Sequence, residues 1–140
     1  MVAAKVDQSS SAKAECRDDD NPNLNNASYA NSNPGVFSGA GSLGEGKTNT
    51  DLILNYCDSD ADAAAALCRA LGPEWFLPSM EELYLLDKNV PNTLNLFSTF
   101  DYYWSSSEHS DFAQWAMDPD NRFDQTGKSN NQYVRAVKEF

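Results

Sequence analysis

The sequence Trp75-Phe76-Leu77-Pro78-Ser79-Met80-Glu81-Glu82 places a short apolar run directly before the start of a helix. Pro78 ends the run, because proline lacks the backbone N–H that the interior of a strand or helix needs. Ser79 and Glu82 then form an S-x-x-E capping box, in which each side chain bonds the backbone N–H of the other residue. We therefore predict a helix that is capped by Ser79 and continues to about Lys88. Its predicted buried side carries Met80, Leu83, Tyr84 and Leu86.

Two more helices are predicted upstream of this one. An apolar stripe predicts a helix over 51–57, which Thr50 or Asp51 can cap. The polar break at 58–60 provides a new cap for a second helix over about 61–71, and Gly72 and Pro73 end it. Alanines at 63–66 make the second helix thin, so that it can approach a sheet closely.

The pattern changes after Asp101 to short apolar pieces separated by polar residues. The strand candidates are 102–104, 114–117 and 133–137, and the last shows the period-two alternation of a half-buried strand. A further short strand is predicted over 2–6, within a loop-rich part that covers residues 1–35. Because helices come first and an antiparallel meander follows, the chain is predicted to be a single α+β domain over residues 1–140.

The chain is strongly acidic, with 10 Lys and Arg residues against 21 Asp and Glu and a net charge of −11. Such a charge repels phosphate backbones and anionic lipid surfaces, and no Lys or Arg cluster offsets it. We therefore expect no nucleic acid partner. The longest apolar run, 63–68, is far shorter than the roughly 20 residues of a membrane span, so we expect no direct membrane insertion. Residues 1–6 lack the features of a secretory signal, so either export is absent or its signal lies upstream.

The three cysteines, Cys16, Cys57 and Cys68, are too few and too irregularly spaced for a disulfide scaffold or a zinc site. One disulfide with a spare thiol and three reduced thiols both fit this spacing, so the sequence leaves the redox compartment open. We expect no transition-metal site.

The segment Gly41 to Thr48 matches the phosphate-loop pattern G-x-x-x-x-G-K-[ST], and a helix is predicted to follow it. A phosphate loop leaves the end of a buried strand, whereas residues 34–40 are too rich in glycine to form one. The capping box also places Asp87 on a helix rather than at a strand end, where it could orient magnesium. Nucleotide binding through this loop is therefore kept only as an alternative, and we expect Lys47 to be exposed.

No catalytic residue is predicted. His109 is the only histidine, and it lies in a polar turn without a second histidine or a nearby thiol. Glu81 and Glu82 point about 100° apart on a helix, so they cannot act as a paired acid and base. The oxygen-rich segment 118–121 with Asp124 lacks the EF-hand spacing, and we interpret it as an exposed acidic turn rather than a calcium site.

Six blocks of sequence occur in a recognisable order. They are Gly44-Glu45-Gly46-Lys47-Thr48-Asn49-Thr50, Ala64-Ala65-Ala66-Leu67-Cys68, Trp75-Phe76-Leu77-Pro78-Ser79-Met80-Glu81-Glu82-Leu83, Tyr103-Trp104-Ser105-Ser106-Ser107-Glu108, Gln114-Trp115-Ala116 and Tyr133-Val134-Arg135-Ala136-Val137. Together they resemble the Lcl C-terminal domain family, named after the end domain of collagen-like bacterial adhesins. The resemblance covers most of the chain, and in that family the glycine block is an ordinary loop entering the first helix.

The resemblance implies a C-type-lectin-like fold, with helices packed on a small twisted antiparallel sheet and long loops on one side. Members of the family are mostly secreted or cell-surface ligand-binding modules, and several are variable proteins of diversity-generating retroelements. A phage virion and the cytoplasm are the alternative locations. In this layout residues 102–140 form the variable binding region. Its framework residues are Trp104, Trp115, Tyr133, Val134, Arg135 and Val137, and we expect Trp75 and Trp115 to be largely buried.

The function predicted from these observations is non-enzymatic binding of a protein or carbohydrate, without a cofactor. The segment 108–132 has no helical period and mixes aromatic with hydrogen-bonding side chains, as adaptable contact surfaces do. An enzyme resembling the formylglycine-generating enzymes is the alternative within this broad fold, but neither Cys57 nor Cys68 lies near the C-terminal cleft in sequence. The predicted ligand-binding residues are His109, Ser110, Asp111, Phe112, Gln114, Asp118, Asp120, Arg122, Phe123, Gln125, Ser129, Asn130 and Gln132.

Overall fold

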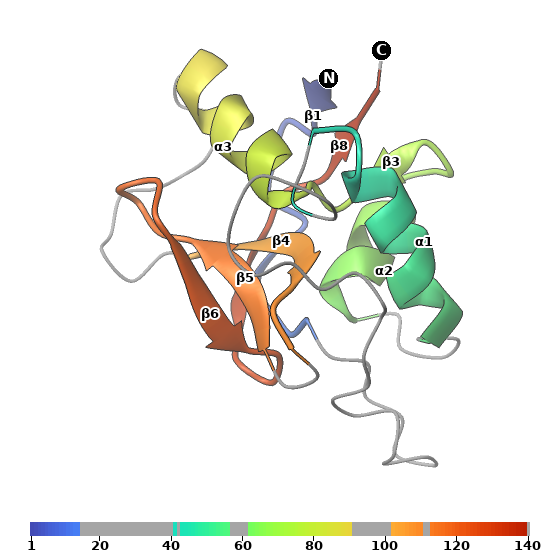
Figure 1. Ribbon diagram of the computed structural model, residues 1–140. Helices are drawn as coiled ribbons and strands as arrows, with labels where there is room; N and C mark the ends of the chain where they lie inside the picture. Colours follow the sequence, from blue (N-terminus) through green and yellow to red (C-terminus); the bar gives the residue numbers. More distant parts are fainter. Residues whose placement is uncertain (15–40, 42, 57–61, 91–101, 111–112, 140) are drawn as a thin grey trace.

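The computed structural model describes residues 1–14, 41, 43–56, 62–90, 102–110 and 113–139 (Figure 1). Its helices are α1 (Gly46–Tyr56), α2 (Ala64–Arg69) and α3 (Met80–Asn89). Its strands are β1 (Val2–Ala3), β2 (Ser9–Ala12), β3 (Trp75–Phe76), β4 (Tyr103–Glu108), β5 (Ala113–Met117), β6 (Phe123–Gly127), β7 (Gln132–Val134) and β8 (Val137–Lys138). The predicted α+β class is confirmed.

The strands form a curled five-stranded sheet, in the order β2-β7-β4-β5-β6, and a small three-stranded sheet, in the order β1-β8-β3. The predicted antiparallel pairing is confirmed for β4 and β5, and β6 extends it where no strand was predicted, with Met117 opposite both Tyr103 and Phe123. β7 lies beside β4 in a parallel pairing, at Tyr103 and Tyr133. The larger sheet is therefore mixed rather than purely antiparallel.

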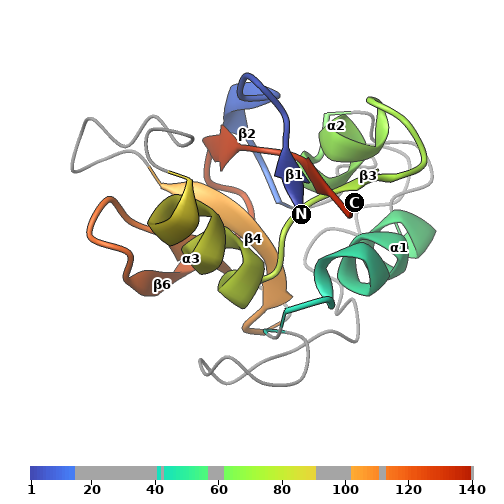
Figure 2. The same cartoon turned by 90° about the horizontal axis from the view of Figure 1, so that it is seen from above.

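The N-terminal and C-terminal ends of the chain lie side by side (Figures 1 and 2). β1 pairs with β8, and β2 pairs with β7. Such short strands are marginal without further support. Asp7 supplies it, because its carboxylate accepts hydrogen bonds from Arg135 Nε at 2.7 Å and from the Tyr103 hydroxyl group at 3.0 Å.

β4 is buried along its whole length because helices cover both of its faces. Trp104 belongs to a core cluster with Cys68 of α2 on one face, and Tyr103 belongs to a second cluster with Leu83 of α3. Figure 2 shows α3 on one side of β4 and α1 and α2 on the other. A strand with two covered faces loses the alternation of buried and exposed residues, and this explains the continuous burial of its serines.

The serines of β4 attach the strand to the segment that precedes α3. Ser106 N donates to the Pro78 carbonyl oxygen at 2.7 Å, and Met80 N donates to Ser107 Oγ at 3.1 Å. Asn49 of α1 donates through Nδ2 to Ser106 Oγ at 3.2 Å. Buried polar groups need such partners, so these contacts place β4 relative to α1 and α3.

The capping box at the start of α3 is confirmed, and its glutamate also holds the start of α1. Glu82 Oε2 accepts a hydrogen bond from Ser79 N at 2.7 Å, and Glu82 Oε1 accepts one from Gly44 N at 2.9 Å. Gly46 N donates to the same carboxylate. A side chain at Gly46 would collide with the Glu82 carboxylate and with the Leu77 carbonyl oxygen, so this position requires glycine.

The predicted start of α1 is wrong, because the helix begins at Gly46 and not at Thr50 or Asp51. The Glu82 carboxylate caps the N–H groups of this first turn, which frees Thr50 for another contact. The Thr50 hydroxyl group accepts from Leu77 N at 3.0 Å and donates to the Leu77 carbonyl oxygen. The cap is therefore supplied by a residue that is remote in sequence.

Helix α2 is shorter than the predicted range of 61–71. The predicted cap at 58–60 lies outside the described residues, and Ala63 at the N-cap position makes no side-chain cap bond. Gly72 follows the helix with a φ of +143°, a conformation that favours glycine. The thin alanine helix is confirmed as a close-packing element, since Ala63, Ala64 and Ala65 are each 1% exposed.

The strand prediction needs correction in part, and β1 covers only residues 2–3 of the predicted 2–6. β2 and β6 are not recognised from the sequence, because both are polar and lie at the edges of the larger sheet. The predicted strand 133–137 is interrupted, since Arg135 and Ala136 carry the chain from β7 in one sheet to β8 in the other. At this crossing Arg135 is buried and bonds Asp7 and the Ala4 carbonyl oxygen, which a single alternating strand would not predict.

The expected burial of the tryptophans is also corrected. Trp104 is the fully buried one, and its Nε1–H donates to the Ala12 carbonyl oxygen at 2.8 Å. Trp75 and Trp115 are only partly buried. Trp75 is at the edge of a core cluster, with Lys138 Nζ 4.9 Å from the centre of its ring.

Replacing Glu82 with Gln should lower the free energy of unfolding by about 3 kcal/mol, because the neutral amide has one oxygen acceptor for several buried N–H donors. Ser79→Ala should cost about 1 kcal/mol, the usual value of an N-cap. Glu81→Gln is the matched control, since Glu81 is partly exposed and accepts from Leu43 N in an exposed contact. Urea unfolding measures all three. Equal losses for the Glu81 and Glu82 variants would contradict the role of Glu82.

The contribution of Glu82 should also depend on pH. Burial raises the pKa of its carboxyl group above 4.5, and the N–H groups of Ser79, Gly44 and Gly46 oppose part of this rise. The folded protein then binds the proton more tightly than the unfolded chain does, so this contribution falls as the pH rises from 4.5 through the raised pKa. Urea unfolding from about pH 4 to about pH 8 measures the free energy of unfolding of the native chain and of Glu82→Gln. The difference between the two values should fall as the pH rises. A flat difference would contradict the assignment.

Candidate ligand-binding surface

The predicted ligand-binding residues separate by exposure. Asp111 and Phe112 lie outside the described residues. The exposed members are Asp120, Arg122, Gln125, Ser129 and Asn130. The partly buried members are His109, Ser110, Phe123 and Gln132, and the buried ones are Gln114 and Asp118.

The structure divides these residues between the two ends of the β5–β6 hairpin. Asp118, Asp120 and Arg122 belong to the turn that joins β5 to β6, which we call the hairpin turn. The opposite end, which we call the loop end, carries His109, Ser110, Ser129 and Asn130. Since β6 has 5 residues, the two ends are about 16 Å apart. One small ligand cannot contact both ends at once, but a macromolecule can.

The hairpin turn is organised around the buried carboxylate of Asp118. Asp118 Oδ1 accepts hydrogen bonds from the backbone N–H groups of Asp120 and Arg122, both at 2.9 Å. The Arg122 side chain is 73% exposed and bonds Asp118 Oδ2 at 3.2 Å and Asp120 Oδ2 at 3.0 Å. The expectation of a wholly exposed acidic turn is therefore corrected at Asp118, which is 5% exposed.

Two of the carboxylates considered for calcium thus contact a guanidinium group. The third, Asp124, accepts from the Tyr102 hydroxyl group at 3.4 Å. Among the described residues, no group of three or more His, Cys, Asp or Glu side chains is placed to hold a metal ion.

Trp115 lies between the two ends, on β5. Its ring is partly exposed and contacts His109 edge to face, with the ring centres 4.9 Å apart. The exposed residue Gln125 is opposite Trp115 on β6. A partly exposed aromatic ring with polar neighbours can pack on an apolar ligand group while the neighbours form hydrogen bonds.

Within the described residues, His109 lacks the contact that orients a catalytic histidine. In a Ser/His/Asp triad, a carboxylate bonds the Nδ1 atom of the imidazole. Nδ1 of His109 is buried, and none of the described residues is its hydrogen-bond partner. The geometry therefore supports a contact role for this side chain.

A buried ion pair, which the sequence does not reveal, holds the loop end in place. Lys128 Nζ lies 2.6 Å from Glu108 Oε2, and both side chains are fully buried. The backbone of Lys128 also accepts a hydrogen bond from Ala14 N at 3.0 Å. Glu108 ends β4 and Lys128 follows β6, so the pair attaches the turn after β6 to the central strand. The continuous burial of β4 is the one signal that could have indicated the position of Glu108.

Two predicted contact residues belong to the interior instead. Gln114 is fully buried, and its Nε2 donates to the Ser105 carbonyl oxygen at 2.5 Å. Its position opposite Glu108 places it on the face of β5 that points into the protein. Phe123 is partly buried and packs on the core cluster that includes Met117. The polar residues around Phe123 made it look exposed in sequence, but its side chain packs on a cluster that includes Leu83 and Leu86 of α3.

In the segment 41–48, which matches the phosphate-loop pattern, backbone N–H groups bond the carboxylates of Glu81 and Glu82. Leu43 N donates to Glu81 Oε2 at 2.7 Å, and Gly44 N donates to Glu82. In a nucleotide site such N–H groups cradle phosphate oxygens. Lys47 is exposed, as expected. The geometry therefore favours a structural role for this loop over nucleotide binding.

Cys68 does not form a reactive thiol site. It is fully buried in α2, and burial raises the pKa of its thiol far above the ordinary value. A thiol must ionise to act as a nucleophile or bind a metal. Cys16 and Cys57 lie outside the described residues. Within the described part of the chain, none of the helices has both the length and the apolar character needed to cross a membrane.

Comparison of the chain with protein-family models finds no matching family. Comparison with curated proteins finds no match either.

Replacing Lys128 with Ala should lower the free energy of unfolding by about 3 to 5 kcal/mol, because Glu108 would keep its buried charge without its cation. The double variant Glu108→Leu with Lys128→Met should recover most of this loss, since it removes both charges and keeps the volume. Thermal and urea unfolding measure both variants. A double variant as unstable as Lys128→Ala would show that the pair's charges are not the cause.

Proposed function

We propose that this chain is a non-enzymatic ligand-binding module, secreted or displayed on a cell surface, which contacts a protein or carbohydrate. Contact is made through the β5–β6 surface, defined here as His109, Trp115, Arg122, Gln125, Ser129 and Asn130. The observation that carries the proposal is the division of the C-terminal part by burial. Most of the predicted framework residues are buried, with Trp104, Val134 and Val137 0% exposed, whereas Arg122 and Gln125 are exposed. The framework residues Trp115 and Tyr133 are partly exposed, and Trp115 is therefore assigned to the contact surface.

The underlying scaffold supports such a role. The buried contacts of β4 and the Glu108–Lys128 ion pair hold both hairpin strands, so exposed side chains on them need little ordering when a ligand binds. Arg and Trp side chains supply much of the free energy of binding at protein interfaces. The separation of the two ends favours a macromolecular ligand over a small one.

We also propose that the fold is C-type-lectin-like and that the chain is related to the Lcl C-terminal domain family. Helices packed on a small curled sheet agree with this proposal, as does the burial of two of the blocks that carry the resemblance, at 76–80 and 103–108. Those blocks include the WFLPS and YWSSSE segments, which contact each other through Pro78 and Ser106. A measured structure with a different strand order would contradict the relation.

The same division suggests a variable protein of a diversity-generating retroelement, with residues 102–140 as the rewritten region. Exposed positions on a rigid scaffold accept substitution at little cost in stability. The gene provides the test. A nearby repeat of the last third that differs only at adenines, together with a reverse transcriptase gene, would support this proposal. A genome that lacks both would contradict it.

Arg122→Ala and Gln125→Ala should each weaken ligand binding at least about fivefold and change the free energy of unfolding by no more than about 0.5 kcal/mol. The labelled chain is applied to a glycan array and to an array of displayed surface proteins, and hits are titrated with each variant. Asn55→Ala is the matched control, since Asn55 is an exposed polar residue on α1.

A melting curve of each variant distinguishes the loss of a ligand contact from the loss of the fold. Trp115→Ala should destabilise the protein by less than the roughly 3 to 5 kcal/mol of a truncated core aromatic, because its ring is partly exposed. It should still weaken binding. If Arg122→Ala and Gln125→Ala bind every hit as tightly as Asn55→Ala does, the β5–β6 surface is not the contact site.

A further inference from the structure

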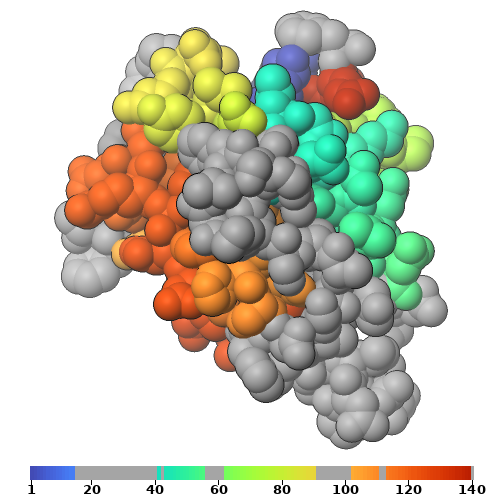
Figure 3. All heavy atoms as spheres, viewed as in Figure 1, coloured from blue at the N-terminus to red at the C-terminus, as the bar shows by residue number. Residues whose placement is uncertain are grey.

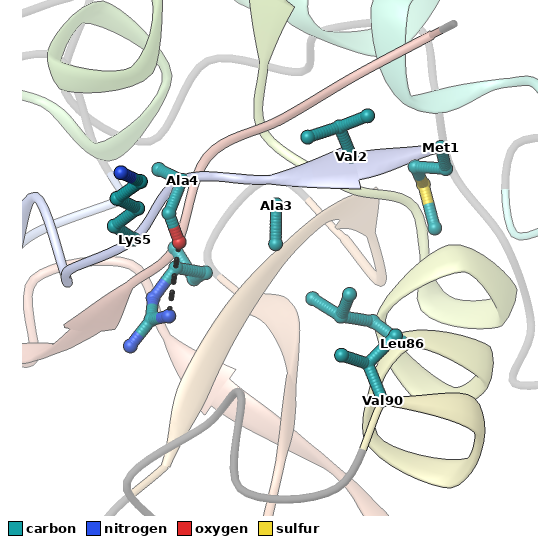
Figure 4. A pocket seen from close by; sticks show the side chains of 8 residues that line it. Met1, Val2, Ala3, Ala4, Lys5, Leu86 and Val90 are labelled. Atoms are coloured by element: carbon teal, nitrogen blue, oxygen red, sulfur yellow. Dashed lines mark hydrogen bonds between the residues drawn. The ribbon is translucent and has the colours of Figure 1, made fainter.

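A cavity of about 380 Å³ lies between β1 and the C-terminal half of α3 (Figure 4). None of its lining residues belongs to the β5–β6 surface. Its volume falls within the range of about 300 to 1,000 Å³ that is typical of small-molecule sites. The space-filling view shows α3 and the ends of the chain on one side of the molecule (Figure 3).

One wall of the cavity is apolar. Leu86 and Val90 come from one side of α3, and Ala3 of β1 points toward Leu86 (Figure 4). Val90 is 47% exposed, which makes it one of the large apolar side chains that the described protein leaves in contact with solvent. Covering such a side chain with a hydrocarbon group is favourable by about 25 cal/mol for each Å² removed from water.

The other end of the cavity is basic. Lys5 lies at the far end of β1 from Met1 (Figure 4), and it is exposed. Within the described residues, no carboxylate forms an ion pair with Lys5. Arg135 also lines the cavity and is only 3% exposed. Two cations at one cavity are notable in a chain whose net charge is −11.

Arg135 is held rigidly in this position. Its Nη2 lies 2.6 Å from Asp7 Oδ1, its Nε bonds the same oxygen, and its Nη1 donates to the Ala4 carbonyl oxygen at 3.1 Å. Asp7 neutralises the charge of Arg135, so Lys5 supplies the uncompensated positive charge. A guanidinium group has five N–H donors, and these contacts use three of them. Arg135 therefore offers donors whose position is already set before a ligand binds.

We propose that this cavity binds a small amphiphilic carboxylate. Its hydrocarbon chain lies against Ala3, Leu86 and Val90, and its carboxylate contacts Lys5 and Arg135. A cationic amphiphile is disfavoured because it would bring a third positive charge to the basic end. A neutral amphiphile can cover the apolar wall but gains nothing from Lys5.

Calorimetric titration of the 140-residue chain with sodium octanoate, 1-octanol and octylammonium chloride tests the proposal. Octanoate should bind saturably and about fivefold more tightly than 1-octanol, because an exposed charge contact is worth up to about 1 kcal/mol. Octylammonium should bind more weakly than both. Equal affinity for octanoate and 1-octanol, or no saturable binding of octanoate, would overturn the proposal.

Two variants locate the site, and each has a matched control. Lys5→Ala should weaken octanoate binding about fivefold and leave 1-octanol binding unchanged, whereas Lys47→Ala, at an exposed lysine outside the cavity, should change neither. Val90→Asp should weaken both ligands at least about tenfold. Leu71→Asp is its control, because Leu71 is 47% exposed, as Val90 is, and does not line the cavity. Melting curves of each variant check that the fold is retained, which is expected because Lys5 and Val90 are both exposed. If Leu71→Asp weakens octanoate binding as much as Val90→Asp does, the cavity is not the site.

Discussion

The carboxylate of Glu82 is the contact on which the arrangement of the other elements depends. It is buried at the point where α1 and α3 begin. It accepts hydrogen bonds from Ser79 N at the N-cap of α3 and from Gly44 N and Gly46 N at the start of α1. Each helix start leaves N–H groups that need acceptors, and a buried start without them is costly. One side chain satisfies both starts, so the two helices cannot move apart without leaving several buried donors without acceptors.

This junction determines the position of the sheet. The segment from Leu77 to Met80 bonds Thr50 of α1 on one side and the serines of β4 on the other. β4 then aligns β5 through backbone pairing, and β5 aligns β6. The exposed side chains of the β5–β6 surface are therefore placed by a continuous set of buried hydrogen bonds that begins at Glu82.

Buried charge at both ends of the C-terminal part serves the same purpose. Glu108 and Lys128 hold the loop end, while Asp7 and Arg135 hold the first residues of the chain against the crossing between the two sheets. Such pairs gain little net stability, because removing two charges from water is costly. Their geometry is nevertheless specific, and the Glu108–Lys128 pair keeps the polar groups of the loop end in defined positions. The cavity between β1 and α3 uses the same Arg135 as part of its wall.

The sequence by itself determined the α+β class, the capping box at Ser79 and Glu82, the thin alanine helix and the strands β4 and β5, because these depend on contacts between residues close in the chain. It also indicated correctly that Lys47 is exposed. The start of α1 was missed because its cap comes from Glu82, 38 residues after Gly44. The burial of Gln114, Asp118 and Lys128 was missed for the same reason, since their polar side chains are buried only through partners that folding brings to them. Sequence periodicity indicates the face of a helix or strand on which a residue lies, whereas the burial of that face depends on the elements that pack against it. Only the tertiary structure decides this burial. It places some of the predicted contact residues at the hairpin turn, some at the loop end and some in the interior.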